Sequence, residues 1–538
     1  MKTTMKTTIL LVFLLQFSTL SFYGQEWVRV FYWGNGLIPM QLNEHYDKGY
    51  LIGADYLINS FLFTGWIIKT DVNGNTLWHK TIGNNQTKWT LEGFDNTPDG
   101  GLIISGSTDT LDPDWELPYV TKLNACGEVE WCHIYETANK PGYSRSIVTL
   151  ADGTFILNLT ESIGQRVQLK HLDQNGDIIW EQTYFQEDTL IQVPVQRSIQ
   201  ITWDQKCLIT GYCYYPDSGQ TIPLWLRPML VLADSSGEGI WEIPWGYNQP
   251  FSYNVHGEGY QSLYTPTGIY TSISQYYWPN AHYTPTLIKT SLAGDPLSYH
   301  DIIDSAAFGH ASTLDRISDS LFISGIWYAF GPTNPNLSVV KIDTIGDIKK
   351  EKIINHSEYP PKDALITSDN HYLITAIDYY INKLSIKLWK LDLDLEWAAI
   401  DTVPRTYDSL CPYPITSGPV FLQCDVISGI REPALGTEKV KMKVYPNPGR
   451  SSITVQMPEC IQLQTSTEHL NVTTVFHQWN KDLVLEVFDT WGKKVKEMMI
   501  TPSKKEINLD VSGWPPGVYL LRLLHKQQAV STAKLMVE

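Results

Sequence analysis

Aromatic side chains are the residues of this sequence best suited to bind a ligand. They gather in a few stretches between apolar runs, at Trp115, Tyr214, Tyr215, Trp225, Tyr276, Tyr277, Trp278, Tyr283, Trp327 and Tyr328. Flat, amphipathic Trp and Tyr rings offer contacts that suit sugar rings or a protein partner. The alternative is that these rings cap the ends of a β-structure and pack beneath their own loops. We expect a glycan- or protein-binding surface where these stretches meet.

Sequence motifs for catalysis are absent. The chain has no HExxH helix, no GxSxG elbow, no P-loop and no GxGxxG before a helix, and its 13 histidines are scattered. We therefore expect no metal or cofactor and favour a binding protein over an enzyme. A carbohydrate-active enzyme (glycosidase or polysaccharide lyase) is the alternative, because its acids meet only in space. Such an enzyme would show facing carboxylates, or a His with a Tyr or Arg. A structural surface component is a third hypothesis.

The aromatic stretches belong to a repeat with a period of about 45–60 residues. Each unit has a polar turn before an apolar run, at Asp47, Asp99, Asp152, Asp204, Thr267, Asp319 and Asp369. Each also has a hairpin, at 71–78, 124–131, 173–180, 234–241, 291–298, 343–350 and 392–397. In the first hairpin, Asn73-Gly74 is typical of a two-residue turn. Seven units of four short strands predict an all-β, seven-bladed β-propeller over residues 25–405, because radial stacking buries both faces of each sheet.

Propeller geometry also predicts where binding occurs. Strands within a blade alternate in direction, so the first-to-second and third-to-fourth connections share one face, and these are nearly all tight. The other connections are long, for example 107–118, 213–228 and 274–285. Long loops on a rigid scaffold are where binding sites usually lie. Four carboxylates in these loops could hold a cation or sugar hydroxyls, although we favour the interpretation that they are solvated loop side chains: Asp109, Asp112, Asp114 and Asp217.

Two further features of the repeat concern how the ring holds together. Residues 27–34 resemble the outer strand of a unit that lacks its other strands, and such a strand could complete the last blade and close the ring; an unrelated N-terminal strand is the alternative. Tryptophan recurs at one place in the hairpins and predicts packing between blades, at Trp78, Trp131, Trp180, Trp241 and Trp397. The units resemble secreted bacterial propeller repeats, written DGG-apolar run-G and KTD-x-NG-x-x-x-W.

Composition and the N-terminus indicate an exported protein. The 538 residues carry a net charge of −17, which disfavours nucleic-acid binding, and 12% are aromatic while only 18% are charged. Residues 1–24 have a basic start, an apolar run at 9–15 and small or polar residues near the end, as in a signal peptide. No later run is long enough to span a membrane. We expect a secreted or surface-attached protein that reaches the outside through the periplasm.

The seven cysteines suggest a local disulfide after the repeats. We interpret residues 406–443 as a linker. In it, Cys411 and Cys424 flank a Pro-containing loop, and these two cysteines are the best candidates for a disulfide. Cys126 and Cys132 flank a hairpin out of register and are a weaker pair. Two others, Cys207 and Cys213, lie roughly 20 Å apart along one predicted strand, too far to bridge. Cys460 has no evident local partner.

Residues 444–538 show a new pattern of alternating strands, typical of a small Ig-like β-sandwich. Its motif residues are Tyr445, Pro446, Asn447, Pro448, Gly492, Lys493, Pro516, Gly517 and Tyr519. These motifs, YPNP, D-x-x-G-K and PGVYLLR, resemble the type A C-terminal sorting domain of type IX secretion cargo in Bacteroidota. The resemblance implies the type IX machinery as a partner. It also implies cleavage of this domain, after which the passenger is released or anchored to lipopolysaccharide.

Overall fold

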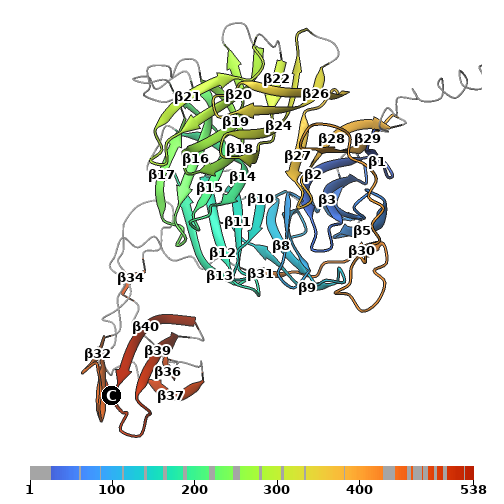
Figure 1. Ribbon diagram of the computed structural model, residues 1–538. Coiled ribbons are helices and arrows are strands. Elements are labelled where there is room, and N and C mark those ends of the chain that lie inside the picture. The colour runs from blue at the N-terminus through green and yellow to red at the C-terminus, as the bar shows by residue number, and fades with distance from the viewer. Residues whose placement is uncertain are drawn as a thin grey trace, which may run out of the picture. The chain divides into compact units, whose positions relative to one another are not determined.

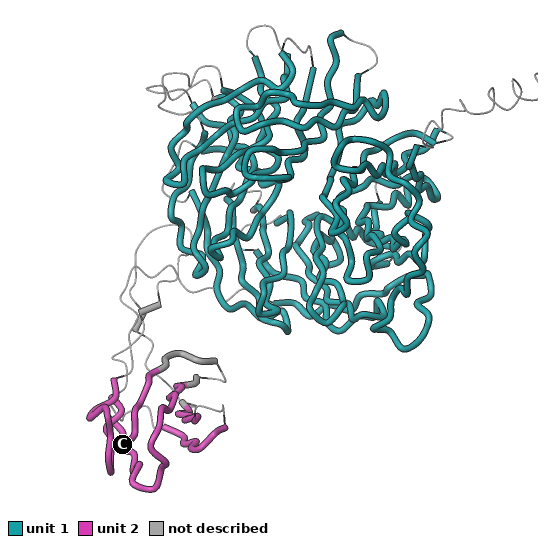
Figure 2. The backbone as a smooth tube through the Cα atoms, viewed as in Figure 1, with its two compact units in different colours: residues 1–429 teal, residues 430–538 magenta. Residues whose placement is uncertain are grey.

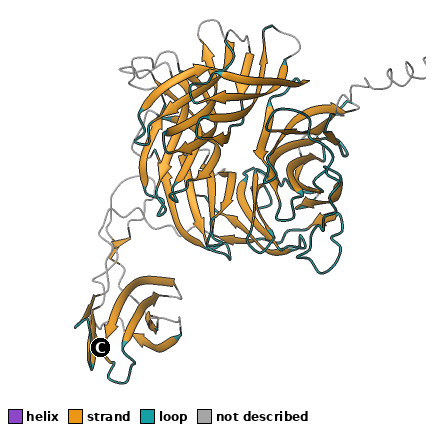
Figure 3. Cartoon of the chain, in the orientation of Figure 1, coloured by secondary structure: helices purple, strands orange, loops and turns teal. Residues whose placement is uncertain are grey.

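All regular secondary structure in the described part of the chain consists of β-strands (Figure 3). The computed structural model describes residues 26–427 and 443–538, except 60–61, 85, 112–113, 138–141, 162–165, 186–190, 217–223, 246–254, 278–281, 305–307, 332–334, 381, 457–461, 464–474, 477–482, 490–492, 501–505 and 526–527. The chain divides into two compact units, residues 1–429 and 430–538 (Figure 2). Among the described residues, no helix is long and apolar enough to cross a membrane. The predicted signal peptide, residues 1–24, lies outside the described residues.

The first unit is built from antiparallel sheets that follow one another along the chain, numbered here from 1 to 7. Sheet 1 contains β2 (Leu37–Glu44), β3 (Tyr50–Leu57), β4 (Phe63–Thr70) and β5 (Thr76–Ile82). Sheet 2 contains β6 (Gly93–Asn96), β7 (Leu102–Thr108), β8 (Leu117–Leu123) and β9 (Val129–Tyr135). Sheet 3 contains β10 (Gly142–Thr149), β11 (Phe155–Glu161), β12 (Arg166–Leu172) and β13 (Ile178–Tyr184). Sheet 4 contains β14 (Gln192–Ile201), β15 (Cys207–Pro216), β16 (Leu224–Ala233) and β17 (Gly239–Pro244).

The remaining sheets of this unit have the same order of strands. Sheet 5 contains β18 (His256–Thr265), β19 (Gly268–Tyr277), β20 (His282–Thr290) and β21 (Pro296–Asp301). Sheet 6 contains β22 (Phe308–Ala311), β23 (Asp315–Ser318), β24 (Leu321–Ala329), β25 (Asn336–Asp343) and β26 (Ile348–His356). Sheet 7 contains β27 (Pro361–Ile366), β28 (His371–Tyr380), β29 (Lys383–Asp392) and, from the start of the chain, β1 (Val28–Phe31).

These sheets form a β-propeller-like ring, with the first strand of each sheet towards the centre and the last outside (Figure 1). One apolar core lies between each pair of consecutive sheets, and one of these cores joins sheet 7 to sheet 1. Because a neighbour covers each face, the middle strands are buried on both sides, as in β7 and β8. This explains why the second strand of a unit reads as an unbroken apolar run rather than an alternating one.

The repeated tryptophans pack between sheets, as predicted. The indole N–H of Trp131 donates to the carbonyl oxygen of Gln174 at 3.0 Å, and a Cβ added at Gly176 would lie 2.8 Å from the Trp131 ring. Trp241 likewise donates to Leu292 of the next hairpin at 3.1 Å. The hairpin glycine is therefore required twice: for its positive φ angle, 84° at Gly176, and for the close approach of the preceding tryptophan.

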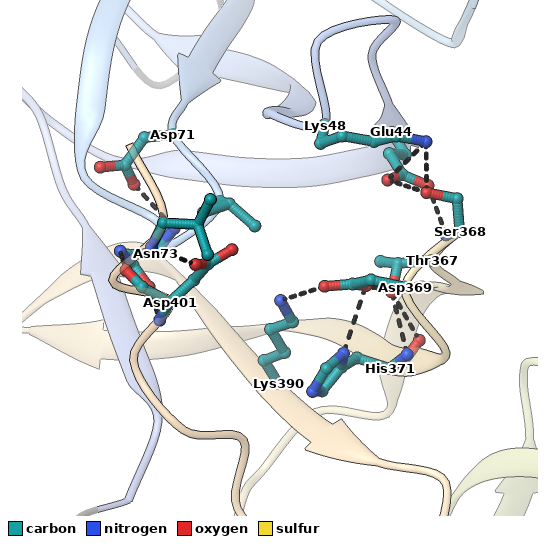
Figure 4. A network of polar contacts seen from close by, with 12 residues as sticks. Glu44, Lys48, Asp71, Asn73, Thr367, Ser368, Asp369, His371, Lys390 and Asp401 are labelled. Atoms are coloured by element: carbon teal, nitrogen blue, oxygen red, sulfur yellow. Dashed lines mark hydrogen bonds and ion pairs between the residues drawn. The ribbon is translucent and has the colours of Figure 1, made fainter. Parts of the chain in front are cut away.

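The N-terminal strand completes sheet 7, as predicted for residues 27–34. β1 pairs antiparallel with β29, with Val28 opposite Trp389, so the last sheet receives its outer strand from the other end of the chain. At the turns between the first two strands of sheets 7 and 1, the Ser368 hydroxyl donates to Glu44 at 2.7 Å (Figure 4). Sheets 7 and 1 are thus joined by a shared core, a swapped strand and polar contacts.

Side chains also link five of the seven innermost strands to the next sheet. Amide or carboxylate oxygens accept a backbone N–H from the following sheet in five places: Gln41 from Phe94 (3.0 Å), Asp95 from Thr149 (2.8 Å), Gln200 from Tyr264 (3.0 Å), Gln261 from Leu314 (3.0 Å) and Asp363 from Leu42 (2.7 Å). The last of these closes the ring between sheets 7 and 1. Backbone N–H groups on the strand edges that face the centre thereby find acceptors without pairing with another strand.

We predict that the Asp363 link makes stability depend on pH. Burial raises the pKa of Asp363 to about 7 from 3.8. The folded protein therefore binds this proton more tightly than the unfolded chain, so the free energy of unfolding falls as pH rises through about 4 to 7, by up to about 4 kcal/mol. Urea unfolding followed by tryptophan fluorescence measures this slope.

The matched variants are Asp363→Asn, which keeps an acceptor but cannot ionise, and Asp363→Leu, which removes the acceptor. We expect Asp363→Asn to reduce the pH slope, while the buried carboxyls of Asp55 and Asp315, whose pKa values are also raised, keep the rest. We expect Asp363→Leu to lose about 1–3 kcal/mol relative to Asp363→Asn because the Leu42 N–H loses its partner. Equal stability of the two variants, or an unchanged slope in Asp363→Asn, would contradict this account.

The segment after sheet 7, residues 398–427, forms a strap along sheets 1 and 2. Its strands β30 (Gly418–Val420) and β31 (Asp425–Ile427) add in parallel to the outer edges of β5 and β9. Backbone hydrogen bonds continue the pairing, for example from Gly83 N–H to Val420 oxygen at 2.9 Å. The strap covers two sheet edges that would otherwise be open to pairing with another chain. This packing differs from the linker predicted to begin at residue 406.

The predicted disulfide between Cys411 and Cys424 is wrong. Cys411 pairs with Cys126 and Cys424 pairs with Cys132, with Cα–Cα distances of 5.0 and 4.4 Å. The prediction considered local partners only, whereas the ring returns the end of the chain to sheet 2. Cys207 and Cys213 are buried in sheet 4 and belong to neither of these bonds. Cys460 lies outside the described residues.

We predict that the two strap disulfides contribute strongly to stability. They close sequence separations of 285 and 292 residues, so they remove much of the freedom of the unfolded chain. We expect Cys411→Ser with Cys424→Ser to lower the free energy of unfolding by about 2–5 kcal/mol, measured by urea titration. Cys207→Ser serves as a control for the loss of a buried thiol. A smaller effect of the double variant than of the control would refute the prediction.

The second unit contains two sheets around one core. The first sheet consists of β32 (Lys443–Tyr445), β33 (Ser452–Gln456) and β38 (Glu506–Asp510). The second consists of β36 (Leu483–Phe488), β37 (Lys494–Ile500), β39 (Gly517–His525) and β40 (Gln528–Val537). A separate pair is formed by β34 (Gln462–Leu463) and β35 (Val475–Phe476). Apolar side chains of both larger sheets meet, including Val455 and Leu509 from one and Val487 and Leu521 from the other.

The motif residues of this unit hold its strands together. Asn447 donates from Nδ2 to the Lys534 oxygen at 2.7 Å and accepts from the Met536 N–H at 2.8 Å, which ties the YPNP segment to β40. Tyr445 donates to Glu506 at 2.7 Å, and Tyr519 donates to the Pro515 oxygen at 2.8 Å. Gly492 lies outside the described residues.

Candidate functional site

The long connections lie at one end of the ring, as the repeat predicts. First-to-second and third-to-fourth strands are joined by short turns, such as 45–49 and 71–75. The connections between second and third strands vary in length and include the longer segments 109–116 and 217–223. We call the end with the long connections the loop face and the other end the turn face. Many loop-face residues lie outside the described part of the chain, among them Trp278, Asp112 and Asp217.

The structure separates the predicted binding aromatics into two groups. Tyr215 and Tyr328 are each only 4% exposed and pack within the fold, as the alternative interpretation proposed. The others are at least partly accessible: Trp115 and Tyr214 are each 40% exposed, and Trp225, Tyr276, Tyr277, Tyr283 and Trp327 are less so. Trp225 stacks on His256 at 4.7 Å between ring centroids, and Tyr277 stacks on His282 at 4.9 Å.

Three of the predicted aromatics converge on a histidine that sequence reasoning missed. His310 on β22 lies 5.9 Å from Tyr283 and 5.5 Å from Trp327, measured between ring centroids. Tyr276 lies 5.0 Å from Tyr283. These rings come from sheets 5 and 6, and they gather beside the innermost strands near the loop face.

A hydrogen-bonded network of four side chains starts at His310. Its Nδ1 lies 3.0 Å from the hydroxyl of Tyr260, which lies 3.1 Å from Oε2 of Glu258. The guanidinium of Arg197 donates to the same carboxylate oxygen at 2.9 Å. Arg197 lies on β14, Glu258 and Tyr260 on β18, so the Arg–Glu–Tyr–His network spans the innermost strands of sheets 4, 5 and 6. Sequence reasoning named none of these four residues.

Burial sets the protonation of this network. Desolvation lowers the pKa of His310 to about 4, against the opposing charge of Glu258, so the imidazole is neutral near pH 7. Desolvation also raises the pKa of Tyr260 well above its usual value, so the phenol keeps its proton. A neutral imidazole that can accept a proton therefore lies next to a phenol that can donate one, with a guanidinium nearby.

A common register places two of these residues, Arg197 and Tyr260. Both lie in β-bulges of their innermost strand, between 196 and 198 and between 259 and 261, and bulges at 39–41, 144–146 and 361–363 repeat the pattern in sheets 1, 3 and 7. The bulged residue stands seven positions before the turn residue of its unit, as Arg197 does before Asp204. Applied to all units, this spacing defines the central ring: Met40, Glu92, Arg145, Arg197, Tyr260, Ser312 and Lys362.

This spacing is the sequence signal that could have located the site. A β-bulge turns a side chain away from the regular alternation of its strand, so it can direct a residue towards the centre. Because the residue type varies from unit to unit there, with only arginine occurring twice, the central ring does not stand out as a repeat. Only the fixed distance to the turn residue identifies it.

The candidate cation site of the described residues is on the turn face and already contains an ammonium group. His45, Asp47 and Asp408 place ligand atoms within 4.8 Å of one another. Nζ of Lys69 lies 2.6 Å from both His45 Nδ1 and Asp47 Oδ1. A lysine therefore supplies the positive charge that a metal ion would bring. The hairpin carboxylate of Asp71 accepts hydrogen bonds from the backbone N–H groups of Asn73 and Asn75, both at 2.8 Å. It therefore stabilises the turn in which it lies.

The comparisons identify the second unit. Residues 443–538 match the family model "Secretion system C-terminal sorting domain". The chain is therefore a type IX secretion cargo, and it is secreted to the cell surface or the extracellular space. A search of curated proteins finds no match.

Solved structures match about two thirds of the chain at low similarity. An ulvan lyase of polysaccharide lyase family PL25 aligns with 67% of this chain and 95% of its own, at 10% identity and a TM-score of 0.43. Drosophila Semaphorin 1b, extracellular domains 1–2, aligns with 67% of this chain and 86% of its own, at 9% identity and a TM-score of 0.40. The β-propeller domain of the Trilobed protease from Pyrococcus furiosus aligns with 68% of this chain and 100% of its own, at 9% identity and a TM-score of 0.37. Similarity of this degree says nothing about what this chain binds.

We predict that His310 titrates far below the ordinary histidine pKa of about 6.5. Since burial holds its pKa at about 4, its ring should stay neutral across about pH 5 to 8. NMR titration of the histidine ring protons, with His310→Gln to assign the signal, measures the midpoint. A His310 midpoint above about 6 would contradict the burial of this ring.

Proposed function

We propose that this protein is a secreted or surface-displayed seven-bladed β-propeller that binds a glycan at the loop-face end of its ring. Seven successive sheets among the described residues, with a core between each pair, support the blade count. The two sheets of the second unit support an Ig-like sandwich for the sorting domain, which engages the type IX machinery and is removed on export. The propeller, residues 25–405 with its strap, is then released or anchored to lipopolysaccharide.

One observation carries the binding proposal: the aromatic rings and the polar network share a single location. Tyr283 and Trp327 contact His310, which is hydrogen-bonded to Tyr260. Sugar recognition combines flat rings that cover the apolar face of a pyranose with polar groups that bind its hydroxyls. A protein ligand would need a larger exposed apolar surface, which makes it the weaker candidate.

A second function, a polysaccharide lyase, is favoured by the His310–Tyr260 pair. In β-elimination from a uronate, a base removes the proton from C5, the bond between C4 and its oxygen breaks, and an acid protonates the leaving oxygen. The neutral imidazole of His310 and the phenol of Tyr260 are a base and an acid 3.0 Å apart. Arg197 could stabilise the negative charge that develops on the uronate. A facing His and Tyr is the arrangement expected of an enzyme rather than a simple binder.

A glycan array with the mature full-length chain tests the binding proposal. We expect a defined set of glycans to bind, and Tyr283→Ala to weaken that binding about tenfold or more because a stacking ring is lost. Trp203→Ala is the matched control, since Trp203 is 67% exposed but lies at the turn between β14 and β15 on the turn face. No bound glycan, or equal loss in the control, would overturn the proposal.

Incubation of the bound glycans separates the two functions. Unsaturated products that disappear in His310→Gln and Tyr260→Phe, while binding remains, would establish the lyase. Binding without any product would leave the protein a glycan-binding propeller and reject the lyase.

A further inference from the structure

We propose that Arg145, Arg197 and Lys362 form an anion site at the centre of the ring, which selects carboxylated or sulfated glycans over neutral ones. The inference rests on the proposed glycan-binding function and adds the chemical class of the ligand. It depends on the charges of the central ring rather than on the aromatics of the loop face.

The fold places these three cations at equivalent positions of their innermost strands, and therefore at a similar height along the axis of the ring. Each lies in the bulge of its innermost strand, β10, β14 or β27, and each stands seven residues before its turn residue. Because the strands enclose a common centre, side chains at equivalent bulges approach one another from different sheets. The central ring thus holds three cations, on sheets 3, 4 and 7, and one carboxylate, Glu92.

Two of the three cations lack a direct ion pair, although the carboxylate of Glu92 attracts both of them. Arg197 pairs with Glu258, whereas neither Arg145 nor Lys362 forms an ion pair within the described part of the chain. Nε of Arg145 is buried and has no hydrogen-bond partner there. A buried donor of this kind normally has a partner, so this N–H could donate to a ligand oxygen that approaches it.

The charges that act on Lys362 come from sheets that do not adjoin its own. The Lys362 side chain reaches solvent, yet the surrounding protein lowers the pKa of its ammonium by desolvation, and Arg197 lowers it further while Glu92 raises it. Arg197 belongs to sheet 4 and Glu92 to sheet 2, and neither sheet adjoins sheet 7. These charges therefore meet across the centre, where two cations repel each other and an anion would relieve that repulsion.

The position of the cations makes this a specific site rather than a general property of the surface. The whole chain carries a net charge of −17, which repels polyanions at long range. A bound anion must therefore be held locally by charge-assisted hydrogen bonds. Carboxylate and sulfate groups of a glycan share this chemistry, and the network residues Tyr260 and His310 lie beside it to contact the sugar.

The test compares matched oligosaccharides by isothermal titration of the full-length protein at low salt. The pairs are an oligogalacturonate with its fully methyl-esterified form, and a sulfated galactan oligosaccharide with its desulfated form. The variant is Arg145→Gln with Lys362→Gln. The control, Arg316→Gln with Lys349→Gln, removes the same charge at the turn face, where these residues pair with Asp319 and Asp343.

We expect at least one acidic member to bind about tenfold or more tightly than its neutral partner, and the variant but not the control to lose that preference. A preference within the galacturonate pair would identify a carboxylate as the group that binds, and a preference within the galactan pair would identify a sulfate. Equal binding of acidic and neutral forms to the unchanged protein, or equal loss in the control, would overturn the anion site while leaving glycan binding intact.

Inorganic sulfate, titrated into the same proteins, tests the anion site without any sugar. If no oligosaccharide binds but sulfate binds saturably and needs Arg145 and Lys362, the anion site stands and the glycan function fails. If sulfate does not bind and no acidic preference is seen, the anion site is rejected. Should the double variant not fold, Lys362→Gln alone, at a solvent-exposed position, gives the same comparison.

Discussion

Closure of the ring is the constraint on which the rest of the first unit depends. Each sheet is covered on both faces by its neighbours, so sheet 7 needs sheet 1 as much as it needs sheet 6. The chain meets this need with β1, which pairs with β29, and with the bond from the Leu42 N–H to Asp363. The strap then crosses from sheet 7 to sheets 1 and 2 and is fixed there by two disulfides.

A closed ring also gives one repeated position an unusual role. The equivalent position of each innermost strand, a bulge in sheets 1, 3, 4, 5 and 7, can carry a different side chain from unit to unit without disturbing the cores. Arg197 and Tyr260 occupy two such positions and join one hydrogen-bonded network. In this way a repeat that maintains the fold can still build an asymmetric site, because cations, a carboxylate and a phenol each occur in different sheets.

The sequence predicted the repeating parts well and the convergent parts poorly. Hairpins such as 71–78, the packing role of Trp131 and the outer strand at residues 27–34 could be predicted, because each depends on local pattern and on the period of the repeat. The disulfides of Cys411 and Cys424 could not, since their partners lie more than 280 residues away and only ring closure brings them near. His310 was likewise hidden, because its partners Tyr260 and Trp327 come from different strands.

The most direct measurement is anomalous diffraction from crystals of the protein soaked in selenate, a heavier analogue of sulfate. The account predicts an anomalous peak at the centre of the ring, within hydrogen-bonding distance of Arg145 or Lys362 and on the loop-face side near Tyr260. Peaks found only on the outer surface, with the centre empty, would contradict the claim that the bulges of the innermost strands build a functional site.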